Sequence, residues 1–131
     1  MGTKIGMKRT TPKHGIRKHL PTKWELDKLF SDKIRAKGCC EYCGKVLPKE
    51  KLECHHFIPR VFLQTRYEPD AACSVDSSCH FLLQNHAREN EAFFIKLRGQ
   101  ERVEELYRTK IIYKKFDRER TLDYMRSRKS L

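Results

Sequence analysis

The segments CCEYCGK (residues 39–45), KLECHHFIPR (residues 51–60) and CSVDSSCH (residues 73–80) hold all six cysteines of the chain and three of its six histidines. In the first of them, Cys40 and Cys43 form a C-x-x-C pair followed by Gly44. This pattern is typical of a zinc knuckle, in which a tight turn directs two thiolates at one ion. A structural zinc site needs four donors, so the knuckle predicts a second pair elsewhere in the chain.

The third segment offers that second pair. Cys79 is one expected donor, and two residues compete for the remaining position. Asp76 has the x-x spacing to Cys79 but supplies a carboxylate, which zinc also accepts, whereas Cys73 supplies a thiolate at a looser spacing. We therefore expect structural Zn²⁺ on Cys40, Cys43 and Cys79, with either Asp76 or Cys73 as the fourth ligand.

Two other uses of the cysteines fit less well. Cys43 and His56 have the spacing of a two-Cys, two-His zinc finger, but residues 60–62 are Arg, Val and Phe, so the second histidine is missing. A redox C-x-x-C opens a helix, whereas a loop containing Pro48 follows here.

The histidines indicate a second site. His55 and His56 lie on a predicted strand, where neighbours face opposite sides, so both serve one site only if the backbone bends near Pro59. A zinc ion joining residues 40–43 to 76–79 would bring His80 toward this strand. A neutral imidazole can deprotonate water, and a divalent cation absorbs charge on a phosphate, which together suit phosphodiester hydrolysis.

Charge indicates the partner. The 131 residues carry a net charge of +12, with 11 Lys and Arg against 3 Asp and Glu over residues 1–38, and 9 against 3 over residues 108–131. Basic ends favour a nucleic acid, because neutralised phosphates release counterions. The chain shows neither a membrane-spanning apolar run nor a signal peptide, so we expect a reducing cytoplasm.

Hydrophobic periodicity predicts the elements. We expect a flexible basic arm over residues 1–20, one folded domain over 21–115 and a basic C-terminal helix or tail over 116–131. The elements should be a helix over 22–37, capped by Thr22 with Glu25, a strand over 51–60, an irregular stretch over 61–78, and helices over 79–97, 101–113 and 116–128. The first helix should bury its apolar side, which comprises Trp24, Leu26, Leu29, Phe30 and Ile34.

With these segments in order, the sequence resembles the HNH nucleases. More closely, KLFSDKIRAKGCCEYCGK, HHFIPR, YEPDAACSVDSSCH and FFIKLRGQERVEELYRTK together look like the NinG (Rap) recombination proteins of lambda-like phages, over residues 28–110. The resemblance implies a small α+β fold, a zinc-stapled ββα-metal (HNH, or His-Me finger) core with flanking helices. It also implies a DNA endonuclease that acts on recombination intermediates in a bacterial host cytoplasm.

The resemblance further implies roles for individual residues. His56 would be the general base, Arg60 would contact a phosphate, and His55 and His80, with Gln84 one turn further on, would hold a catalytic Mg²⁺ or Mn²⁺. The middle Asn of the HNH motif, which orients the base, is replaced by Ala71, with Asp70 as a substitute if the register slips by one. The alternative is a zinc-dependent DNA-binding module whose catalytic site has degenerated.

The basic ends would grip DNA backbone phosphates on either side of the cleft. The protein would act as a monomer or a homodimer, with no membrane contact. The residues expected to bind DNA, besides Arg60, are Lys8, Arg9, Lys13, Arg17, Lys18, Lys114, Lys115, Arg118 and Arg120.

Overall fold

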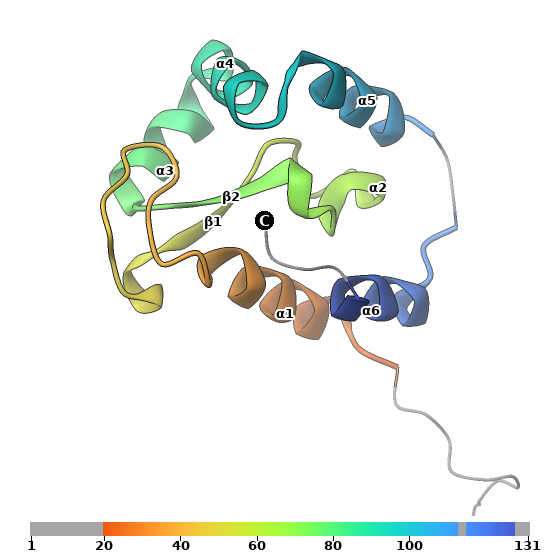
Figure 1. Ribbon diagram of the computed structural model, residues 1–131. Coiled ribbons are helices and arrows are strands. Elements are labelled where there is room, and N and C mark those ends of the chain that lie inside the picture. The colour runs from red at the N-terminus through yellow and green to blue at the C-terminus, as the bar shows by residue number, and fades with distance from the viewer. Residues whose placement is uncertain (1–19, 113–114, 128–131) are drawn as a thin grey trace, which may run out of the picture.

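The computed structural model describes residues 20–112 and 115–127, which form a small α+β fold (Figure 1). Six of the expected DNA-binding residues, namely Lys8, Arg9, Lys13, Arg17, Lys18 and Lys114, lie outside the described residues, as does nearly all of the expected arm over 1–20. The elements are α1 (Lys23–Arg35), η1 (Lys49–Lys51), β1 (Glu53–His56), α2 (Leu63–Arg66), η2 (Pro69–Ala71), β2 (Ala72–Val75), α3 (Ser77–Asn85), α4 (Ala87–Arg98), α5 (Gln100–Lys110) and α6 (Arg118–Ser127).

The first helix begins where the sequence predicts. The Thr22 side chain accepts a hydrogen bond from the Glu25 amide at 3.1 Å, and the Glu25 carboxylate accepts one from the Thr22 amide at 2.8 Å. This reciprocal capping box pairs two amides that have no partner within the helix. The predicted cap of α1 is thus confirmed.

Three predicted elements differ from the structure. The stretch over 61–78 contains α2, η2 and β2, so the prediction that it is irregular is wrong. The expected helix over 79–97 is divided into α3 and α4, because His86 has extended backbone angles of φ −134° and ψ 93°. Trp24 is 71% exposed and Leu29 is 42% exposed, so neither belongs to the core that buries Leu26, Phe30 and Ile34.

Two strands form the sheet of the described chain. β1 and β2 are antiparallel, with His55 opposite Cys73 and His56 opposite Ala72. Because side chains alternate along a strand, Glu53 and His55 face one side of the sheet, and Cys54 and His56 face the other.

Helices cover both faces of this sheet, which makes three layers (Figure 1). On one face, α1 and α6 pack through a cluster of buried side chains that includes Phe30, Ala72 and Met125. On the other face, α3, α4 and α5 pack through a larger cluster that includes Cys73, Leu83 and Phe94. None of the helices in the described residues is long and apolar enough to cross a membrane.

Phe94, on α4, lies at the centre of the larger cluster, where its ring is fully buried 4.7 Å from that of Phe57. Phe94→Ala should lower the free energy of unfolding by about 3–5 kcal/mol, because it leaves a cavity that the surrounding side chains cannot fill. Phe81→Ala is the matched control, since Phe81 is 68% exposed, and it should cost no more than about 0.5 kcal/mol. Urea unfolding of the two variants measures the difference, and equal losses would contradict this assignment of the core.

Candidate functional site

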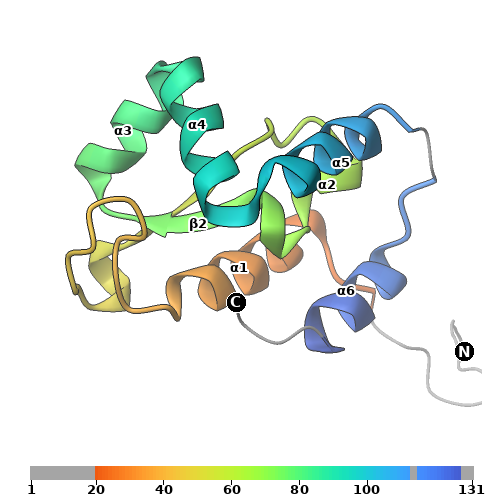
Figure 2. The same cartoon turned by 45° about the horizontal axis from the view of Figure 1, so that its top comes forward.

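The loop after α1 is folded so that two cysteines point the same way. The Cys40 amide donates to the Lys45 carbonyl, and the Gly44 amide donates to the Cys40 carbonyl, both at 2.8 Å. Gly44 has a φ of +85°, a conformation that favours glycine, which explains why Gly follows the C-x-x-C pair. Figure 2 shows that this loop lies beside the start of α3.

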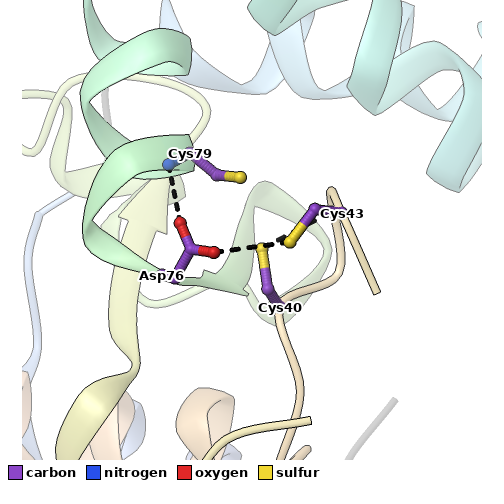
Figure 3. A group of neighbouring side chains, drawn as sticks. All are labelled: Cys40, Cys43, Asp76 and Cys79. Atoms are coloured by element: carbon purple, nitrogen blue, oxygen red, sulfur yellow. Dashed lines mark hydrogen bonds between the residues drawn. The ribbon is translucent and has the colours of Figure 1, made fainter. Parts of the chain in front are cut away.

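Asp76 is the residue through which the loop meets α3. One of its carboxylate oxygens, Oδ1, caps the helix by accepting a hydrogen bond from the Cys79 amide at 2.8 Å. The other, Oδ2, accepts one from the Cys43 thiol at 3.3 Å (Figure 3). The cap therefore holds Asp76 in the orientation that directs Oδ2 at the cysteines.

These contacts complete a group that could hold a metal ion. The donor atoms of Cys40, Cys43, Asp76 and Cys79 all lie within 4.8 Å of one another. A tetrahedral ion with bonds of 2.0–2.3 Å needs donors about 3.3–3.8 Å apart, so a small contraction would suffice. No second group of three or more His, Cys, Asp or Glu converges to this degree in the part of the chain that the structure describes.

The group decides between the two candidates for the fourth ligand. Cys73 is fully buried on β2 within the larger hydrophobic cluster and is not part of the group. Burial raises the pKa of its thiol far above the ordinary value, as expected of a core residue. Cys73 therefore lies outside the group that could hold a metal ion, and Asp76 supplies the oxygen donor of that group.

Cys40 is prepared for metal binding by its backbone contacts. Burial raises the pKa of its thiol, but hydrogen bonds to the sulfur outweigh this effect and leave the pKa below its ordinary value. One of them comes from the Cys43 amide, 3.5 Å from Cys40 Sγ. These donors favour the thiolate, which is the form that binds metal.

His55 and His56 lie on opposite faces of β1. His55 is 3% exposed and faces α3, where its ring centroid lies 5.2 Å from that of His80. His56 faces α1 and stacks on the ring of Phe30, with centroids 5.4 Å apart. The two side chains still line one cleft, which also includes Arg60 and His80, because the cleft follows β1 between the two helical layers.

The hydrogen-bond partners of the three histidines define which ring nitrogen keeps a lone pair. His80 Nδ1 lies 2.6 Å from Oε1 of Glu53, and His56 Nε2 lies 3.1 Å from the Arg66 carbonyl. Both partners are acceptors, so these two nitrogens carry protons. In the neutral form of each ring, the lone pair then falls on Nε2 of His80 and on Nδ1 of His56.

The tautomer of His55 follows from Asn90 on α4. The Asn90 side-chain amide donates to the Phe57 carbonyl at 3.1 Å, so its oxygen is the atom that lies 2.7 Å from His55 Nε2. That oxygen accepts, so His55 Nε2 is protonated and Nδ1 keeps the lone pair. Burial lowers the pKa of His55, and burial also lowers the pKa of His56 to about 4, so both rings are neutral at neutral pH.

The group that orients His56 differs from the predicted one. Ala71 is 1% exposed in the core, and Asp70 bonds Arg102 at 2.8 Å, so neither is the partner of His56. The Arg66 carbonyl takes that place. Asp27 on α1 holds Arg66 in turn through two hydrogen bonds, from Nε at 3.0 Å and from Nη2 at 2.6 Å.

The remaining predicted residues are divided between the cleft and the surface. Gln84 lines the cleft with the histidines, and Arg60, whose side chain is 57% exposed, lies 3.5 Å from Asp27. Lys115, Arg118 and Arg120, around the start of α6, are exposed and do not line it.

Sequence reasoning missed three residues that line the cleft, Asp27, Glu53 and Asn90, and also Arg66, whose carbonyl contacts His56. Only Glu53 had a usable signal, since it stands two residues before His55 and therefore shares its face of the strand.

No protein-family model, curated protein or solved structure matches the chain.

We call Cys40, Cys43, Asp76 and Cys79 the metal group. Loss of one of its four donors should abolish metal binding. We expect one metal ion per purified chain, and Cys79→Ser should lose it, because three donors bind far more weakly than four. A chelator should lower the melting temperature of the wild type by about 10 °C or more, since the binding energy of a structural metal is folding energy. Cys39→Ser, in the same loop but outside the group, is the control. Elemental analysis measures the metal content and calorimetry measures the melting temperature. A wild-type melting temperature that the chelator does not change would contradict the site.

Asp27→Asn should destabilise the protein in a pH-dependent way. Burial raises the pKa of Asp27, but Arg66 and Arg60 outweigh it and hold the pKa below its ordinary value of 3.8. An aspartate with a lowered pKa stabilises the fold above its ordinary pKa, and that stability is lost as pH falls through the lowered value.

The variant should therefore be less stable than wild type by about 1 kcal/mol at pH 7, and the difference should begin to shrink as the pH falls below about 4. Urea unfolding between pH 3 and 7 measures it. Asp32→Asn removes a carboxylate from the same helix that is 34% exposed, against 25% for Asp27, and should cost less. A difference that persists unchanged at pH 3 would contradict the role of the Asp27 charge.

Proposed function

We propose that this protein is a metal-dependent DNA endonuclease of the HNH type, with a structural zinc ion. The observation that carries the proposal is the cleft along β1, where three histidines with defined lone pairs lie beside Arg60. Zinc is the metal proposed for the Cys40, Cys43, Asp76 and Cys79 group, because three thiolates and one carboxylate are donors that zinc accepts in a tetrahedral site.

In the proposed reaction, His56 Nδ1 removes a proton from the water that attacks the phosphorus atom. The Arg66 carbonyl and the Phe30 ring hold the imidazole in place while it becomes charged. Arg60 binds a phosphate oxygen and positions the scissile group. These steps use residues from α1, β1, the loop before α2 and α2 itself.

His55 Nδ1 and His80 Nε2 are the proposed ligands of a catalytic cation, with Gln84 nearby. When bound, such a cation would stabilise charge on the phosphate and the leaving 3′ oxygen. Imidazole suits transition metals better than Mg²⁺, so of the two expected cations Mn²⁺ is the better match. Asn90 and Glu53 would orient the two ligands through their protonated nitrogens.

A second candidate is a zinc-dependent DNA-binding module without catalysis. One observation favours it: a pKa of about 4 makes His56 a weak base near neutral pH. Both candidates predict salt-dependent affinity for DNA, and they differ in whether the bound DNA is cut.

His56→Ala should lower the cleavage rate by about 10²–10⁴-fold, which is the usual contribution of a general base. DNA affinity and metal content should not change, because the histidine is remote from the metal group. The substrates are supercoiled plasmid and a synthetic four-way junction with Mn²⁺ or Mg²⁺, and their ratio tests the preference for recombination intermediates.

His86→Ala is the matched control, since His86 is exposed at the end of α3 and does not line the cleft. Equal cleavage by wild type and His56→Ala would show that His56 is not the general base. Salt-dependent binding by both proteins without cleavage would instead favour the binding module.

A further inference from the structure

Trp24 is the only tryptophan of the chain, and it lies exposed in the cleft. Its side chain is 71% exposed, and within the described residues it makes no ring stacking or cation–π contact. An aromatic ring that is exposed inside a cleft offers a large flat face on which a planar ligand can stack.

The position of Trp24 on α1 aligns it with the rest of the cleft. Together with Asp27, Lys28, Ser31 and Arg35 it forms the stripe of α1 that lines the cleft. These residues recur at helical spacing, so they share one face of the helix. The indole therefore lies one helical turn from Asp27, which is in contact with Arg60 and Arg66.

Charge complements the indole. Lys28 is exposed on the same stripe, and the Arg60 side chain is 57% exposed. The carboxylate on this stripe, that of Asp27, is neutralised by Arg66 at 2.6 Å. A cleft that carries an exposed aromatic ring and two cations is suited to a nucleotide, whose phosphate binds a cation while its base stacks on the ring.

We propose that Trp24 stacks on an unpaired base of single-stranded DNA next to the phosphate bound by Arg60. The inference rests on the proposed function, because it assumes that DNA enters this cleft. A paired base is already stacked within the duplex and offers its face to no side chain, so Trp24 selects a strand that is single-stranded at this point.

Because Trp24 is the single tryptophan of the chain, the indole fluorescence of the protein reports directly on stacking at this residue. Intrinsic fluorescence of the zinc-loaded protein is recorded, without added Mg²⁺ or Mn²⁺, during titration with a single-stranded oligonucleotide. Covalently closed relaxed plasmid at equal phosphate concentration provides the paired comparison. We expect water-exposed indole emission from the free protein and strong quenching by the oligonucleotide alone.

Affinity is measured separately by anisotropy of a labelled oligonucleotide and by competition with the plasmid. Trp24→Ala should weaken single-strand binding about tenfold and leave duplex binding and the melting temperature unchanged. Trp24→Phe should restore most of the affinity, because its ring still stacks. Phe81→Ala removes another exposed aromatic, outside the cleft, and should change nothing.

The outcomes separate this inference from the proposed function. Binding of the oligonucleotide without quenching, or undiminished binding by Trp24→Ala, would overturn the stacking role and leave the nuclease proposal intact. Emission typical of a buried indole in the free protein would also overturn it, because another part of the chain would then cover Trp24. Failure to bind any DNA at low salt would contradict both the stacking role of Trp24 and the nuclease proposal.

Discussion

The two oxygens of the Asp76 carboxylate connect the cysteine loop to the start of α3. Asp76 Oδ1 caps α3, and its Oδ2 meets the Cys43 thiol at 3.3 Å. The first contact defines where α3 starts, and so which residues occupy its first turn. Cys79 then faces the cysteine loop, while its neighbour His80 reaches Glu53 and the ring of His55. The metal group and the histidine cleft thus both depend on the first turn of α3, which carries Cys79 and His80. A shift of the Asp76 cap would disturb both.

Features that depend on local chemistry could be predicted from the sequence. The capping box of α1 and the glycine turn of the C-x-x-C pair are set by residues within a few positions of one another. The fourth metal ligand could not be chosen in this way. What separates Cys73 from Asp76 is that Cys73 belongs to β2, whose pairing with β1 buries its side chain. That strand was missed because four residues carry too little periodicity to be recognised.

The residues that orient the histidines were hidden for a different reason. The partner of His56 is a backbone carbonyl, and every residue has one, so no residue type at position 66 could reveal it. Asn90 and Asp27 reach the cleft from helices that lie far from β1 in the sequence. Trp24 was assigned to the core because its spacing fits the apolar side of α1, yet only part of that side is covered by α6 and the sheet.

The sheet explains how neighbouring residues on opposite faces can serve one cleft. A bend near Pro59 was expected to be necessary for His55 and His56 to act together. In the described part of the chain, however, β1 pairs only with β2, so its other edge has no neighbouring strand. A cleft along that edge is open to both faces of the strand, and His55 reaches it from the α3 and α4 layer while His56 reaches it from the α1 layer. The geometry of the site therefore depends on how the two helical layers pack on the sheet, since the α1 layer contacts His56 and the α3 and α4 layer contacts His55.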